Sequence, residues 1–214
     1  MKSVYKRFLI TAFALGVSVF LSLGAAYGKT SKYQDLVTEL GGGNLERGVQ
    51  HLEKLAKNGN GAATFLFAHM FLELGDVQKF QRYLYIAADQ GNPNAIKFLA
   101  TSYFKGVLGE QSYEKARTWY EKGALLRNIN SMVYLGIIYR DGLGIDVDNE
   151  AAYFWFSLAG VLKEDVAGQR EPEEFAQEMQ HLVSSNIIEK TAKRIRDWLA
   201  ANPEIKPATI SPIG

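Results

Sequence analysis

The 214-residue sequence predicts an all-α protein built from repeated pairs of helices. Three observations favour this fold class: the chain repeats itself with a period of 36 residues, apolar residues recur at helical spacing inside each copy, and no stretch has the pattern of a strand. A hydrophobic content of 47% and a charged content of 22% are ordinary for a chain that buries a core.

The period is visible when the sequence is aligned with itself at a shift of 36 residues. The aligned pairs are Leu99 and Leu135, Tyr103 and Tyr139, Gly106 and Gly142, Ala116 and Ala152, Trp119 and Trp155, and Ala124 and Gly160. An earlier copy places Tyr83 under Trp119 and Ala88 under Ala124. That copy is shorter at its turn, so its front half aligns at a shift of 33, with Leu66 under Leu99.

Each copy predicts two helices joined by a glycine-containing turn. In the middle copy the first helix covers residues 94–103, where Ala95, Leu99 and Tyr103 recur every fourth residue and mark one face. The second helix covers residues 113–124. Glycines at 106 and 109, repeated at 142 and 144, supply the positive φ that ends a helix.

Small residues on these faces predict close approach of the paired helices, and tryptophans fill the space between neighbouring units. The small residues are Ala100 and Gly136 on the first helices and Ala116 and Ala152 on the second, and the tryptophans are Trp119 and Trp155. In the first copy Phe80 replaces the small residue of the second helix, and the turn shortens to Leu74, Gly75 and Asp76, so we expect a distorted unit there.

A single helix pair cannot bury both of its faces, so stacked pairs in a right-handed superhelical solenoid are the expected architecture. We place the copies at residues 59–90, 91–127 and 128–163. Capping helices are expected before them, in 29–58 (near 33–40 and 45–57), and after them, in 164–203 (near 173–183 and 187–200). Residues 204–214 are predicted to be a flexible tail.

The predicted apolar positions of the C-terminal capping helices are Phe175, Met179, Leu182, Ile188, Ile195 and Trp198. Basic residues at 190, 193, 194 and 196 are predicted to lie near a helix C-terminus, where the helix dipole favours positive charge. Glutamates at 171, 173 and 174 are predicted at a helix N-terminus for the converse reason.

The motif Leu-Gly-x-x-Tyr-x-x-Gly-x-Gly, followed by Ala-x-x-Trp, occurs at Leu135–Gly144 and Ala152–Trp155, and Leu99 to Ala124 matches it nearly as well. This pattern resembles the Sel1-like repeat, a relative of the tetratricopeptide repeat, over about residues 59–163. The resemblance implies an αα solenoid that works as an interaction scaffold, for example in assembling envelope or motility complexes or in holding a sensor protein inactive.

The N-terminus has the order of a secretory signal. Lys2, Lys6 and Arg7 precede an apolar stretch over 8–23, and small residues follow at 24–26. We predict cleavage after Gly28, with Ala26 as the second choice, and export to the bacterial periplasm. An uncleaved membrane anchor remains the alternative, although the apolar run is shorter than the roughly 20 residues a spanning helix needs.

The sequence predicts no catalytic residue, no metal site and no cofactor. It contains no cysteine, which excludes thiol nucleophiles and thiolate metal sites, and its three histidines do not have the spacing typical of zinc ligands. The triple glycine at 41–43 is interpreted as a flexible joint and not as a phosphate-binding loop. The net charge of +1 gives no reason to expect nucleic acid as a partner.

In related superhelices the first helix of each pair lines the concave, partner-binding face, so the candidate binding residues lie on these helices. They are Phe65, Lys97, Phe98, Thr101, Tyr134, Ile137 and Arg140. Phe65, Phe98 and Tyr134 align with one another, and such an aromatic row is either a peptide-binding groove or part of the core between helices.

The sequence therefore predicts a non-enzymatic scaffold or adaptor that binds another envelope protein or a peptide. The alternative is an envelope hydrolase, or a β-lactam- or peptidoglycan-binding protein, because some cysteine-rich members of the resembled family have been linked to β-lactam binding. Against it, the cysteines are missing here, and Ser131, Ser157, Ser184 and Ser185 lack a lysine three positions on.

Overall fold

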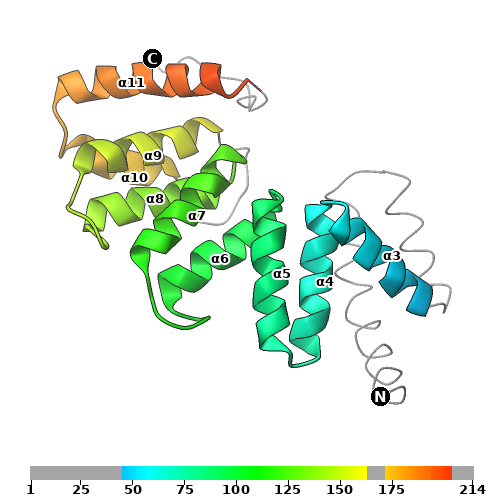
Figure 1. The fold of residues 1–214 in the computed structure, drawn as a ribbon. Helices are drawn as coiled ribbons and strands as arrows, with labels where there is room; N and C mark the ends of the chain where they lie inside the picture. The colour runs from blue at the N-terminus through cyan, green and yellow to red at the C-terminus, as the bar shows by residue number, and fades with distance from the viewer. Residues whose placement is uncertain (1–44, 163–171, 204–214) are drawn as a thin grey trace. The chain divides into compact units, whose positions relative to one another are not determined.

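The computed structural model describes residues 45–162 and 172–203, and their regular structure is entirely helical, from α3 to α11 (Figure 1). The predicted all-α helical-repeat fold is confirmed. Several predicted segments lie outside the described residues: the signal at 1–28, the helix near 33–40, the joint at 41–43, the last residue of the third copy (163), the start of the C-terminal cap at 164–171 and the tail at 204–214. Contacts divide the chain between Ala95 and Ile96 into two compact units.

The first unit contains α3 (Leu45–Lys57), α4 (Gly61–Glu73) and α5 (Val77–Asp89). Helix α4 packs against both α3 and α5. Leu52, Ala63 and Phe67 form a buried cluster at this junction, and Tyr83 of α5 packs against it with its ring 4.9 Å from that of Phe67. The bounds of α3 agree with the helix predicted at 45–57.

The second unit contains most of α6 (Pro93–Lys105), then α7 (Tyr113–Leu125), α8 (Ile129–Asp141) and α9 (Asn149–Leu162). Helix α8 packs against α7 and α9. The C-terminal helices α10 (Pro172–Gln180) and α11 (Ser185–Ala201) both contact α9. Of the three helix pairs that the sequence predicts, α4 with α5 is therefore the first, α6 with α7 the second and α8 with α9 the third.

The junction from the second helix of one pair to the first helix of the next is built in the same way three times. A residue of positive φ ends one helix, and the following asparagine caps the next by accepting a hydrogen bond from the backbone N–H three residues on. These pairs are Gly59 with Asn60 (φ 84° for the first member), Gly91 with Asn92 (78°) and Arg127 with Asn128 (59°). The Asn Oδ1 atoms lie 3.0, 2.9 and 2.8 Å from the nitrogens of Ala63, Ala95 and Ser131.

These caps correct the sequence alignment of the first copy. Asn60 and Asn92 are equivalent, so the front halves align at a shift of 32, and the predicted shift of 33 is wrong. Phe67, which is buried, is then the counterpart of Leu99, and Leu66 takes the place that the alignment gave to Phe65. Phe98 and Tyr134 therefore occupy equivalent positions, as predicted, but Phe65 does not belong to their row.

The small residues lie where helices approach closely, as the sequence predicts. Ala100, Ala116 and Ala152 are fully buried, and the ring of Phe156 lies directly against Gly136. In the first copy, α4 and α5 are each regular helices of 13 residues although Phe80 fills the alanine position. The departure of this copy is confined to its short turn, where Gly75 has a φ of 73°.

Two predictions about the C-terminal helices are wrong. Helix α10 ends at Gln180, so Leu182 lies beyond it and is 61% exposed instead of buried. The basic residues at 190, 193, 194 and 196 lie in the middle of α11 and not in its last turn, so the helix dipole does not explain them. Met179 and Ile195 are buried as predicted, and Glu173 and Glu174 lie in the first turn of α10.

Candidate functional site

The predicted binding positions on α6 and α8 lie partly at the surface of the second unit. Lys97 is exposed, whereas Phe98, Thr101 and Tyr134 are half-buried. Half-buried side chains of this kind pack on one side and remain accessible on the other. Tyr134 therefore packs between helices on one side and keeps part of its ring at the surface.

Tyr134 belongs to an aromatic cluster that links α6, α7 and α8. Its ring stacks on Tyr120 with centroids 4.9 Å apart and an interplanar angle of 5°. Phe104 meets Tyr134 edge-on at 5.1 Å and Tyr113 edge-on at 5.4 Å. We call Phe104, Tyr113, Tyr120 and Tyr134 the aromatic cluster; only Tyr120 is fully buried.

Hydrogen bonds hold the outer part of the aromatic cluster in place. The Gln111 side-chain amide donates to the carbonyl oxygen of Phe104 at 2.7 Å, and it lies 3.0 Å from the hydroxyl of Tyr113. Both bonds anchor the loop that joins α6 to α7 against the rings. Because the rotamer of Tyr113 is restrained before any partner arrives, less conformational entropy is lost on binding.

At the base of the cluster, burial raises the pKa of the Tyr120 hydroxyl well above its ordinary value. Its oxygen has no hydrogen-bond partner among the described residues, although the Thr101 hydroxyl is near enough to offset part of the shift. Tyr120 is therefore neutral at physiological pH. It supports the cluster by packing, with its ring stacked on that of Tyr134.

The predicted residues Ile137 and Arg140 lie where helix α10 packs. Ile137 packs against a buried cluster that includes Phe156 and Met179. The Arg140 guanidinium lies 5.9 Å from the ring centroid of Phe175 and pairs with Asp141 at 2.6 Å. The hydrogen bonds that Arg140 donates to the Asp141 carboxylate raise the pKa of Arg140. Helix α10 lies on this side of α8.

Phe65, the predicted binding residue of the first unit, points into that unit. Its side chain is buried, and its ring lies edge-on to His69 at 4.6 Å. His69 in turn lies 5.9 Å from the ring of Phe80, and burial lowers the pKa of this histidine. Phe65 thus contributes to internal packing of α4 and α5 and offers little surface.

The structure therefore brings Thr101 and Tyr134 together through Tyr120, and it groups Ile137 with Arg140 at α10. Phe104 and Tyr113 are not among the binding residues predicted from the sequence. A signal for Tyr113 was available, since it is the first residue of a helix and follows the capping residue Ser112. No sequence signal places its ring against Phe104, because the loop 106–112 determines that contact.

The described residues contain no group of three or more His, Asp or Glu side chains that could hold a metal ion. Within the same part of the chain, no helix is both long enough and apolar enough to cross a bilayer.

Comparison with protein families finds matches to the Sel1 repeat at residues 40–60, 93–128 and 129–160. The second and third matches coincide with the pairs α6–α7 and α8–α9. The first match contains α3, which the sequence analysis assigned to an N-terminal cap, and the pair α4–α5 lies in the unmatched stretch that follows. Comparison with curated proteins finds no match.

Two solved structures with similar folds are a Sel1 repeat protein from Oxalobacter formigenes and c5321, a protective antigen of uropathogenic Escherichia coli with an SLR fold. The first is 25% identical, with a TM-score of 0.53 over 62% of this chain and 98% of that chain. The second is 19% identical, with a TM-score of 0.56 over 79% of this chain. Only 38% of the c5321 chain is covered, and its likeness shows the fold alone.

Proposed function

This chain is a Sel1 repeat protein, and we propose that it is a non-enzymatic scaffold or adaptor that binds a partner protein or peptide through the aromatic cluster on α6, α7 and α8. Sel1 repeats generally mediate protein–protein interaction. Beyond that general role, we propose a specific binding surface on this chain and a location in the bacterial envelope.

The observation that carries the proposal is the restrained, half-exposed state of the aromatic cluster. Aromatic side chains dominate binding hot spots because they bury a large area with few rotatable bonds. Here Phe104, Tyr113 and Tyr134 are half-buried and come from both of the consecutive matched repeats. Exposed Lys97 and half-buried Phe98 extend the candidate surface along α6.

The order of basic, apolar and small residues over 1–28 supports the second part of the proposal, namely export to the periplasm. N-terminal sequencing of the protein purified from its own cells tests it. We expect the mature chain to begin at Lys29 or Tyr27; a chain that keeps residues 1–28 and stays with the membrane contradicts cleavage.

The binding surface is tested by crosslinking and affinity capture from envelope fractions. We compare the unaltered protein with a double variant, Tyr113→Ala with Tyr134→Ala, and with the matched control Tyr85→Ala. Tyr85 is a partly exposed tyrosine on α5, outside the aromatic cluster. Circular dichroism melts establish that each variant is folded before capture.

The expected result is one partner that the unaltered protein and the Tyr85→Ala control capture and the double variant loses. If the folded double variant captures the partner as well as the unaltered protein does, the aromatic cluster is not the binding surface. Loss of the partner by the control as well points to a general effect of removing tyrosine and also contradicts the assignment.

A further inference from the structure

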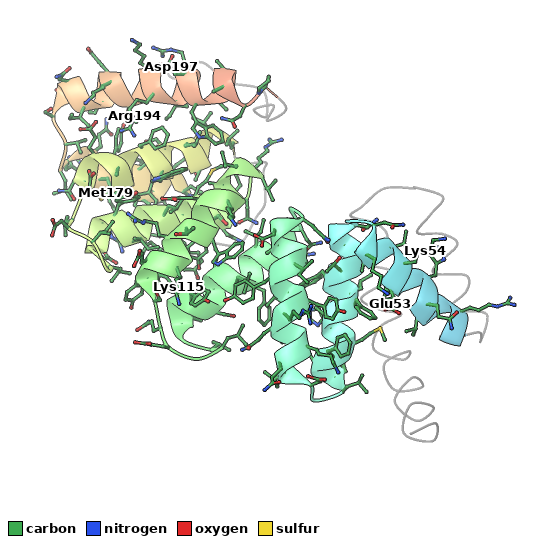
Figure 2. The ribbon with its side chains drawn as sticks, in the orientation of Figure 1. Glu53, Lys54, Lys115, Met179, Arg194 and Asp197 are labelled. Atoms are coloured by element: carbon green, nitrogen blue, oxygen red, sulfur yellow. The ribbon has the colours of Figure 1, made fainter. Side chains whose placement is uncertain are left out.

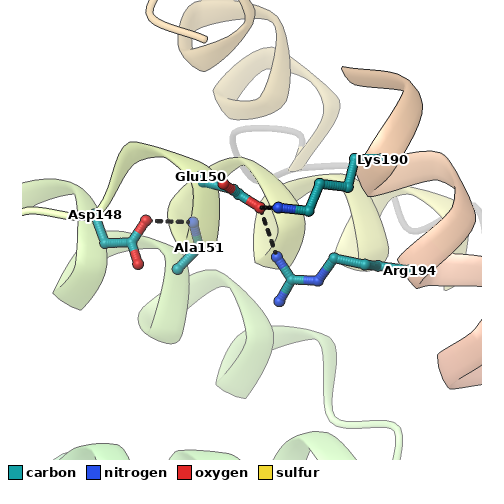
Figure 3. Close-up of polar contacts among 5 residues, drawn as sticks. All are labelled: Asp148, Glu150, Ala151, Lys190 and Arg194. Atoms are coloured by element: carbon teal, nitrogen blue, oxygen red, sulfur yellow. Dashed lines mark hydrogen bonds and ion pairs between the residues drawn. The ribbon is translucent and has the colours of Figure 1, made fainter. Parts of the chain in front are cut away.

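Helix α11 is attached to the second unit through a small set of contacts with α9. The Glu150 carboxylate, in the first turn of α9, lies 3.1 Å from Lys190 Nζ and 3.5 Å from Arg194 Nη1 (Figure 3). The Arg194 guanidinium also lies 4.5 Å from the ring centroid of Phe154, one turn further along α9. Figure 2 shows Arg194 on the side of α11 that faces α9 and Asp197 on the opposite side.

We propose that this face of α9, formed by Glu150 and Phe154, is a second interaction surface that binds a basic amphipathic helix of a partner protein, and that α11 is the internal occupant the partner displaces. The inference rests on the proposed scaffold function and deepens it, since it gives the chemistry of one partner. It uses a surface separate from the aromatic cluster.

Displacement is feasible because α11 is held weakly. The side chains of Lys190, Arg194 and Glu150 are 57%, 43% and 32% exposed, and ion pairs between exposed groups contribute little and weaken further in salt. Only Thr191 and Ile195 of this 17-residue helix are buried. The Thr191 hydroxyl is buried and has no hydrogen-bond partner within residues 45–162 and 172–203, which opposes docking.

Helix α10 shows what firm docking looks like in the same unit. Phe175 of α10 stacks on Phe156 of α9 with centroids 5.0 Å apart and an interplanar angle of 13°. Met179 is buried in the same cluster, and Pro172 at the start of the helix is buried as well. A partner is therefore expected to replace α11 and leave α10 in place.

The contacts of α11 define the partner. Its basic residues Lys190 and Arg194 are four positions apart, as are its buried residues Thr191 and Ile195, so each pair lies on one stripe of the helix. A competing helix needs the same two stripes. One carries two cations spaced i, i+4, which pair with the Glu150 carboxylate and contact the Phe154 ring. The other carries two apolar residues, also spaced i, i+4, which are buried beside the cations. An aliphatic residue at the position of Thr191 removes the unpartnered hydroxyl, so such a partner binds more tightly than α11.

The probe is a synthetic peptide of residues 184–202, labelled for fluorescence anisotropy and titrated with the full chain. In the unaltered chain the attached α11 competes with the peptide. Ile195→Asp in the chain releases α11 without changing α9, so we expect the peptide to bind this variant at least about tenfold more tightly, in proportion to the gain in open protein. A Thr191→Val peptide is expected to bind more tightly still.

Charge exchange identifies the surface. Glu150→Lys in the released chain is expected to abolish binding of the normal peptide and to restore binding of a peptide with Lys190→Glu and Arg194→Glu. Lys193→Ala in the chain is the matched control, because Lys193 is an exposed cation of the same helix, and it is expected to leave the affinity unchanged. If Ile195→Asp impairs folding, Lys190→Glu with Arg194→Glu in the chain releases α11 by repulsion from Glu150.

Equal peptide binding by the unaltered and released chains, or binding that is insensitive to Glu150→Lys, overturns the proposal and leaves α11 as a permanent cap. This outcome does not bear on the aromatic cluster, because the peptide assay contains neither Tyr113→Ala nor Tyr134→Ala. Conversely, a failed capture through the aromatic cluster leaves the peptide result standing, so the two failures are distinguishable.

Discussion

The contact between Gly136 and Phe156 allows a prediction whose size follows from the geometry. A methyl group added at Gly136 would meet three atoms of the Phe156 ring at 2.5 to 2.7 Å. The ring cannot move away freely, because Phe156 is fully buried and stacks on Phe175 of α10. Gly136→Ala therefore overpacks the core at the centre of the α8–α9 pair.

Two opposing effects determine the magnitude. Overpacking of a core destabilises by about 1–3 kcal/mol. Replacing glycine by alanine inside a helix stabilises by about 1 kcal/mol. The contact here falls well inside van der Waals distance, so the upper part of the overpacking range applies, about 2–3 kcal/mol. After the gain of about 1 kcal/mol is subtracted, we expect a net loss of about 1–2 kcal/mol in the free energy of unfolding. For a chain of this size that corresponds to a decrease in Tm of roughly 2–8 °C.

The assay is thermal unfolding by calorimetry, with Gly160→Ala as the matched control. Gly160 is also helical, but its added methyl group would meet the Glu173 side chain at 3.2 Å, and that flexible carboxylate can swing into solvent. The control is expected to be neutral or to gain up to about 1 kcal/mol. A Gly136→Ala protein as stable as the unaltered one refutes the close packing of α8 on α9, and Phe156→Leu is expected to relieve part of the loss.

Three further predictions follow from the described contacts. Asn128 caps α8 by accepting hydrogen bonds from the backbone N–H and the hydroxyl of Ser131. Asn128→Ala is therefore expected to lower the free energy of unfolding by about 1 kcal/mol in denaturant titrations, whereas Asn130→Ala, at an exposed position, is expected to leave it unchanged. Burial lowers the pKa of His69 in the folded state below the ordinary histidine value of 6.5, so at pH values below 6.5 the unfolded state binds more protons. The contribution of His69 to stability is therefore full above that pH and declines as the pH falls, and His69→Leu is expected to flatten this dependence in pH-resolved melts. High salt is expected to raise the rate of amide hydrogen exchange in α11 more than in α10, because it screens the ion pairs of Glu150 with Lys190 and Arg194. Glu150→Gln is expected to raise the exchange rate of α11 already in low salt. Equal protection of the two helices under all conditions contradicts weak docking of α11.

The periodic apolar residues of the sequence predicted where the helices lie, because the spacing of these residues is enough to define the buried face of a helix. Helix α7 begins at Tyr113 as predicted, and the small residues at 100, 116, 136 and 152 lie at close helix contacts. The first copy was misaligned by one residue, since Phe65, Leu66 and Phe67 are all apolar and only packing distinguishes them. Equivalent caps at Asn60 and Asn92 resolve the register, and the Gly-Asn pairs that mark them were present in the sequence.

The sequence by itself determined the class of fold, the helix pairs and the family resemblance, because these depend on contacts between residues close in the chain and on a repeated pattern. Only the tertiary structure decided which apolar residues remain accessible. Phe65 turns inward while Tyr134 stays half-exposed, although both were predicted on a binding face. Likewise, Glu150 pairs with Arg194, which lies 44 positions later in the chain, and this pairing depends on where α11 docks on α9. The spacing of residues within one helix carries no information about which other helix it contacts.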